Sequence, residues 1–127
     1  MEFLLVIARL CFSLIFILSG FNHISNAGMM TKYAKSKNFP SSKFTTILSG
    51  VAIIFGGITV LFGFWVQIGA LILTVFLLVT AFGIHHFWTL EDPMEKMNDQ
   101  NHFLKDLALA GAAFIIWYFG TGPWSIG

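Results

Sequence analysis

Two residues that can exchange protons stand four positions apart in the C-terminal third of the chain. In a helix, His102 and Asp106 lie on one face, where the carboxylate can orient or charge the imidazole. Two further imidazoles, His85 and His86, are adjacent in the sequence. Imidazole beside carboxylate is suited to moving protons. We therefore predict one catalytic, proton-handling site made of His85, His86, His102 and Asp106.

Other polar residues are candidates for binding a ligand near this site. Arg9 stands about two helical turns into an apolar run, where its charge must reach lipid headgroups, pair or face a ligand site. The sequence alone does not decide among these three alternatives. Amide, imidazole and indole groups stand near the ends of the other runs. The predicted cofactor-binding residues are Arg9, His23, Gln67, Trp88 and Asn101.

The predicted ligand is a hydrophobic carrier such as a quinone. Its carbonyl oxygens need hydrogen-bond donors, and its reduction takes up protons. A metal site is the competing interpretation, but the adjacent His85 and His86 would point about 100° apart on a helix, so no metal is predicted. Histidines that only hydrogen-bond helix ends are a third possibility. No covalent cofactor is predicted, and whether the chain is an enzyme stays open.

The elements that must position these residues are four long apolar runs. They cover 3–21, 44–64, 66–84 and 103–119, and each can cross a bilayer at roughly 1.5 Å per helical residue. Hydrophobic residues make up 57% of the 127-residue chain and charged residues only 10%, as in integral membrane proteins. Because four spans need about 80 residues, we predict a single all-α domain folded as a four-helix transmembrane bundle.

The connections between these runs decide where the polar residues gather. Segment 22–43 has helical spacing in its middle, which favours a short interfacial helix, and Pro40 followed by two serines predicts that the second span begins there. Residues 63–67 predict a tight hairpin. Segment 87–102 is acidic, and Pro93 predicts a loop. Because the spans alternate in direction, four histidines are expected on one side of the membrane: His23, His85, His86 and His102.

Positive residues are concentrated on that same side. The opposite side has only Arg9, whereas segments 22–43 and 87–102 hold Lys32, Lys35, Lys37, Lys43 and Lys96. The positive-inside rule predicts a multi-pass protein of the cell (plasma) membrane with both of these segments cytoplasmic and both termini outside.

Composition also limits the classes of partner. The lone Cys11 excludes disulfide chemistry within the chain, and the few cations form no cluster that supports nucleic acid binding. Membrane lipid is the predicted surrounding, and a homo-oligomer stays open.

Five segments carry a family resemblance: 9–20 with His23, 33–40, 50–57, 82–88 and 101–109. Together they resemble the DoxX family of small four-span membrane proteins over nearly the whole chain. The resemblance implies a membrane component of redox systems. Relatives of that kind include quinone-linked subunits of thiosulfate oxidation and membrane partners of sulfurtransferase or superoxide dismutase complexes.

Three positions depart from the family pattern. Members often carry a Glu shortly before the paired glycines of the second span, where this chain has the apolar residues 53–55, so the resemblance supplies no carboxylate for Arg9. His86 replaces a usual Pro and Asp106 a usual Asn, and both changes add titratable groups.

The sequence thus leads to two hypotheses for function. We predict a membrane subunit associated with quinone-linked redox chemistry, which binds a quinone-like ligand and handles protons at the cytoplasmic face. Because no residue carries electrons as a flavin or metal centre does, catalysis would need a bound cofactor or a soluble oxidoreductase or sulfurtransferase partner. The alternative is a non-catalytic membrane scaffold that recruits soluble redox or sulfur-handling enzymes.

Overall fold

The computed structural model describes residues 2–120, and within them it is helical without strands. Its elements are α1 (Glu2–Ser25), α2 (Ala27–Ser36), α3 (Lys43–Phe62), α4 (Val66–Gly83), the 3-10 helix η1 (Phe87–Thr89) and α5 (Pro93–Phe119). Within this range, four helices are long and apolar enough to cross a membrane: α1, α3, α4 and α5. The predicted all-α, four-helix transmembrane fold is confirmed, and the first connection contains the short helix α2.

Local chemistry explains where α3 begins and ends. The Ser42 hydroxyl accepts a hydrogen bond from the Thr45 N–H at 3.2 Å, and the Thr45 hydroxyl accepts one from the Ser42 N–H at 2.9 Å. This reciprocal pair satisfies two N–H groups at the start of α3. The sequence predicted that a helix begins at this place. At the other end Gly63 has φ 74°, a left-handed conformation that glycine adopts without strain, and α4 begins at Val66 as predicted.

The prediction of a loop over 87–102 is wrong. Helix α5 begins at Pro93, ten residues before the predicted start at 103. Proline is tolerated in a first helical turn because its missing N–H is not needed there, and the Asp92 side chain caps the helix by accepting from the Glu95 N–H at 3.0 Å. At roughly 1.5 Å per residue α5 is about 40 Å long, so it exceeds a hydrocarbon core of about 30 Å.

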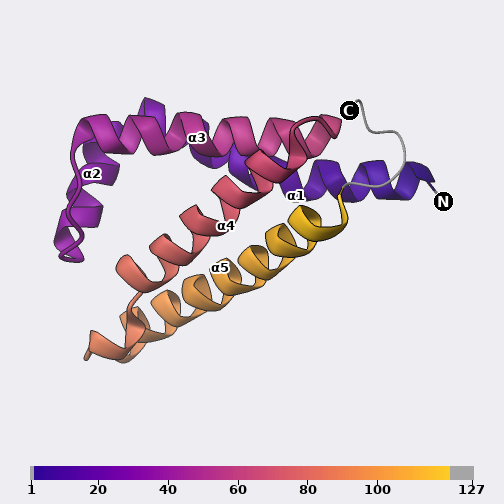
Figure 1. The fold of residues 1–127 in the computed structure, drawn as a ribbon. Helices are drawn as coiled ribbons and strands as arrows, with labels where there is room; N and C mark the ends of the chain where they lie inside the picture. Colours follow the sequence, from indigo (N-terminus) through magenta and orange to yellow (C-terminus); the bar gives the residue numbers. More distant parts are fainter. Residues whose placement is uncertain (1, 121–127) are drawn as a thin grey trace.

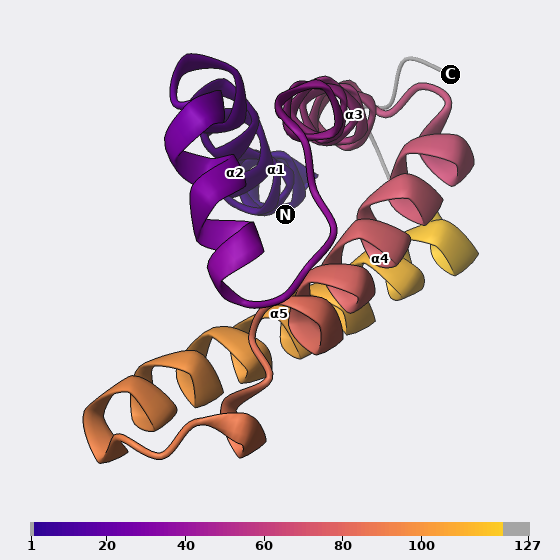
Figure 2. The same ribbon diagram turned by 90° about the vertical axis from the view of Figure 1, so that its left-hand side faces the viewer.

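The four long helices form two pairs. Helix α1 packs along α3 and α4 packs along α5, while α3 and α4 hold the pairs together. Figure 1 shows the pairs close together near the α3–α4 turn and diverging toward α2. Figure 2 shows the end of α2 and the segment after it reaching from the α1–α3 pair toward α4 and α5. At this diverging end, α2 and the segment after it therefore run from one pair toward the other.

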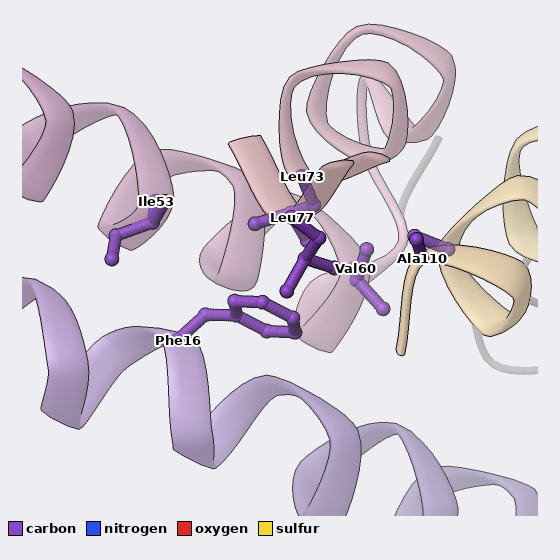
Figure 3. Packing of buried hydrophobic residues seen from close by; sticks show 7 residues of the cluster. Phe16, Ile53, Val60, Leu73, Leu77 and Ala110 are labelled. Carbon is purple, nitrogen blue, oxygen red and sulfur yellow. The ribbon is translucent and has the colours of Figure 1, made fainter. Parts of the chain in front are cut away.

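The apolar core lies where the two pairs meet. Figure 3 shows side chains from all four long helices converging there, and the cluster consists of Phe16, Ile53, Val60, Leu73, Leu77, Ala110 and Ala113. Many other large apolar side chains are exposed along the outer faces of these helices, such as Leu14, Val51, Leu71 and Ile115. A membrane-embedded protein covers such faces with lipid.

Glycines allow α1 and α3 to approach closely at the level of His23. A Cβ atom added to Gly50 would lie 2.7 Å from the His23 Cβ and 2.9 Å from the Gly20 carbonyl oxygen. A Cβ added to Gly20 would lie 2.6 Å from the Gly50 carbonyl oxygen. The two backbones therefore meet glycine to glycine, a packing mode typical of membrane helices.

Candidate functional site

An apolar cavity of about 690 Å³ occupies the space between the diverging helix pairs. Most of its wall is aliphatic or aromatic, including Ile15, Phe16, Phe39, Phe76, Leu77 and Leu109. Its polar groups include His23, His85, His102 and Asp106. A mostly apolar pocket with a few converging polar groups is typical of small-molecule sites.

His85 lies between two carboxylates of α5. Its Nδ1 is 3.6 Å from Oδ1 of Asp99, and its Nε2 is 3.7 Å from Oδ2 of Asp106. Both aspartates are buried, each with 5% of its surface exposed. The connection after α4 brings the imidazole to α5, where positions 99 and 106 share a face because seven residues are close to two helical turns. The result is an acid–base–acid arrangement of two buried carboxylates and a partly buried imidazole.

His102 completes this cluster from the same face of α5. Its ring stacks on that of His85, with centroids 5.0 Å apart and planes inclined by 23°. The ammonium group of Lys105 also lies near the cluster, 3.9 Å from Oδ1 of Asp106. The structure therefore brings together three of the four residues predicted to be catalytic: His85, His102 and Asp106.

Two atoms of the cluster make no hydrogen bond within the described part of the chain. They are Nδ1 of His85 and Oδ2 of Asp106, and both are buried. Buried polar atoms are nearly always paired, so such atoms at the wall of a cavity mark a place for a ligand, a proton or water. Among the described residues, no group of three or more His, Cys, Asp or Glu has the arrangement of a metal site.

A second cavity, which we call the polar vestibule, lies between α2, the α4–α5 connection and the start of α5. It measures about 700 Å³ and is lined by Tyr33, Ser36, Lys37, Asn38, His86, Thr89, Leu90, Glu95, Asn98, Asp99 and His102. Tyr33 and His102 line both this vestibule and the apolar cavity. These two side chains therefore stand at the boundary between a polar and an apolar space.

An ion pair anchors α2 to α5 inside the vestibule. Nζ of Lys37 donates to Oδ2 of Asp99 at 2.6 Å. Burial alone would lower the pKa of Lys37, but the hydrogen bond and charge of Asp99 outweigh it and raise that pKa above its ordinary value. On the lysine side, the stabilisation from the charged Lys37 is fully present below the ordinary lysine pKa and is lost as the pH rises through the raised value. Burial and Asp99 also raise the pKa of Tyr33, which keeps its hydroxyl protonated.

His86 lies apart from the buried cluster and lines the vestibule. Its Nε2 donates to the Lys37 carbonyl oxygen at 2.8 Å, and its Nδ1 is 2.7 Å from the Thr89 hydroxyl oxygen. Phe39 adds an apolar contact, because its ring occupies the space that a side chain at Gly83 would need. Nε2 of His86 thus fastens the end of α2 to the α4–α5 connection, whereas its Nδ1 contacts Thr89 within that connection.

His23 reaches the apolar cavity from α1. Its Nδ1 lies 2.7 Å from the Ser19 carbonyl oxygen, which can only accept, so Nδ1 carries a hydrogen. In the neutral ring Nε2 is then a hydrogen-bond acceptor. Among the predicted cofactor-binding residues, this is the one whose side chain lines a cavity of the described structure.

The structure places the other four predicted cofactor-binding residues elsewhere. Arg9 is buried, with 7% of its surface exposed, but it stands fourteen residues before His23, roughly 21 Å along α1. Gln67 and Asn101 are exposed, Trp88 is 51% exposed, and none of the three lines either cavity. The structure therefore does not gather these four with the histidine cluster.

Sequence reasoning missed Asp99, Lys37 and Tyr33. The predicted loop over 87–102 concealed the spacing of Asp99, which stands three residues before His102 and therefore on its face once the segment is helical. The dipeptide Asp92-Pro93, a capping residue followed by a proline suited to the first turn, was the signal for that helix. Lys37 and Tyr33 had no such signal, because their place depends on how α2 folds back on α5.

Comparison with known proteins agrees with this architecture. A sequence model of DoxX matches residues 4–86, about two thirds of the chain. The chain belongs to the DoxX family. It is also 29% identical over 123 residues to the inner membrane protein YphA of Escherichia coli K12. The aligned region covers 97% of this chain and 87% of that protein. No solved structure matches this DoxX protein.

The family match and the four long helices make this chain a multi-pass membrane protein. The matched region ends at His86, so it includes His23 and His85 but stops before α5. Asp99, His102 and Asp106 therefore lie beyond the part of the chain that the family model matches.

Proposed function

We propose that this DoxX protein binds a quinone-like ligand in the apolar cavity and handles protons for it with His85, His102 and Asp106. The observation that carries the proposal is the partly buried imidazole of His85 between two buried carboxylates at the wall of an apolar cavity. Apolar walls suit a hydrophobic carrier, and titratable groups beside them suit its oxygens.

The residues present fit such a ligand. The cavity of about 690 Å³ falls within the usual range for small-molecule sites, about 300–1,000 Å³. Oδ2 of Asp106 is buried without a hydrogen-bond partner in the described structure, so a ligand oxygen that shares a proton with it would satisfy it. A bound quinone supplies the capacity to accept electrons and protons together. The His102 ring can donate a hydrogen bond toward the cavity, and Asp106 can hold a proton.

Electrons must come from outside the chain. Amino acid side chains such as those around the cavity do not carry electrons in the manner of a flavin or metal centre, so the proposal includes a soluble oxidoreductase or sulfurtransferase partner. Its docking side would be the end of the bundle that carries α2 and the polar vestibule, because protons and ligand meet there.

A cavity-filling variant tests ligand binding. Ser49 lines the apolar cavity from α3, so Ser49→Phe is expected to reduce the quinone that co-purifies with the protein at least about tenfold, a loss of about 1.4 kcal/mol in binding. The neighbouring Leu48 is 55% exposed, and Leu48→Phe is the matched control with unchanged occupancy. Mass spectrometry of gently purified protein measures both.

Two results would count against the quinone proposal. One is wild-type protein that carries no quinone and is not labelled by a photoreactive azidoquinone. The other is equal quinone occupancy in the two phenylalanine variants. A stoichiometric soluble enzyme in a quinone-free preparation would support the scaffold hypothesis instead.

For location, we propose the cell membrane with α2 and the start of α5 on the cytoplasmic side, as the positive-inside rule predicts. In a Cys11→Ser background, Lys35→Cys is expected to be protected from a membrane-impermeant maleimide in intact cells, whereas Trp65→Cys reacts. Both side chains are exposed, so protection reports the side of the membrane. Reaction at position 35 with protection at position 65 would reverse the orientation.

A further inference from the structure

We infer that Asp99 is the residue through which protons pass from the polar vestibule to His85 and on to Asp106. The inference rests on the proposed function for its purpose, since it adds a proton route to the ligand cavity. Asp99 is buried and lines the vestibule, whereas His85 and Asp106 line the apolar cavity. Asp99 therefore connects two spaces that otherwise meet at the boundary residues Tyr33 and His102.

The two oxygens of Asp99 have different partners. Lys37 holds Oδ2 from the vestibule side at 2.6 Å, and Oδ1 lies 3.6 Å from Nδ1 of His85. The ion pair fixes the carboxylate plane, so Oδ1 is kept toward an imidazole nitrogen that has no hydrogen-bond partner in the described structure. Lys37 is accordingly a positioning residue, and Asp99 is the group that exchanges the proton.

The other titratable groups around His85 are less suited to this transfer. Glu95 lines the vestibule but is exposed, and Lys105 sits beside Asp106 rather than on the vestibule side. Tyr33 holds its proton firmly, and both ring nitrogens of His86 are already engaged. His102 stacks on His85, and stacked rings face each other with their π surfaces rather than with a nitrogen aimed at a nitrogen.

The proposed transfer conserves the proton. The neutral His85 ring starts with its hydrogen on Nε2. A hydronium ion in the vestibule protonates Asp99 and becomes water, and Oδ1 passes that proton to Nδ1 of His85. The imidazolium then releases its other proton from Nε2 to Oδ2 of Asp106. This leaves one proton moved and His85 neutral with its hydrogen on Nδ1, so the ring must return to the Nε2–H tautomer before the next transfer. The gaps of 3.6 and 3.7 Å exceed hydrogen-bond length, so each must shorten by several tenths of an ångström during transfer.

The test follows protonation of Asp106 in ligand-free protein. Full-length protein in lipid nanodiscs is subjected to a rapid pH drop, and the carboxylic acid band that Asp106→Asn removes is followed by time-resolved infrared spectroscopy. Asp99→Asn is expected to slow the appearance of this band about tenfold or more, because loss of a positioned proton-transfer group usually costs at least that much. Asp99→Glu should restore much of the rate, and the matched control Glu95→Gln should leave it within about twofold of wild type.

A second variant separates proton transfer from a purely structural role. Asp99→Ala is expected to be slow and to recover its rate with increasing formate, a small weak acid that replaces the missing carboxyl group. Asp99→Ala also tests the inference if Asp99→Asn does not fold. A wild-type rate in Asp99→Asn, equal slowing in Asp99→Glu, no formate rescue, or no band assignable to Asp106 would overturn the inference. Because no quinone is present, a protein that fails the quinone-binding test can still show this route, so the two failures are distinguishable.

Discussion

Replacing Gly50 with valine is expected to separate α1 from α3 and to lower stability by about 3 kcal/mol or more, because a side chain there has no space to enter. Its Cβ would lie 2.7 Å from the His23 Cβ and 2.9 Å from the Gly20 carbonyl oxygen, so backbone must move rather than a flexible side chain. Thermal unfolding of purified protein in one detergent measures the loss, as a lower midpoint or as protein that aggregates on extraction.

Gly111 provides the matched control for this prediction. It lies in α5, and a Cβ added there would meet nothing within 4 Å. Gly111→Val is therefore expected to change stability by no more than about 0.5 kcal/mol. Similar unfolding midpoints for the two variants would mean that α1 and α3 do not meet glycine to glycine.

The second large effect is expected on ligand affinity from His85 and Asp106. His85→Ala and Asp106→Ala should each weaken binding of a short-chain ubiquinone analogue at least about tenfold, or about 1.4 kcal/mol. The double variant should lose little more than the worse single one, because the two groups lie 3.7 Å apart and act as one unit. Competition against a photoreactive azidoquinone measures all three affinities.

Additive losses in this cycle would contradict a shared site. They would mean that the two residues contribute independently, for example by stabilising different parts of the bundle. Lys96→Ala is the control, since Lys96 is an exposed residue of α5 that lines neither cavity. The affinity of this variant for the ubiquinone analogue should remain that of the wild type.

Part of the candidate site could be predicted from helix periodicity and span alternation. Three apolar runs end or begin near histidines, and antiparallel spans necessarily bring those ends to one side. The structure accordingly places His23, His85 and His102 around one cavity. Their catalytic or binding roles stay predictions. His86 shows the limit of the pattern, because one residue beyond His85 the side chain turns to α2 rather than to the cavity.

Within the described chain, the sequence by itself determined the membrane class, the four spanning helices and the caps of α3, because these depend on local composition and on contacts a few residues apart. It also contained the start of α5 at Asp92-Pro93, although the same proline is compatible with a loop when only the local pattern is considered. Only the tertiary structure decided that the helix pairs diverge, that α2 bridges them, and that Lys37 meets Asp99 across 62 residues of chain. Such contacts depend on side chains from separate helices filling the same space, and no local periodicity encodes that choice.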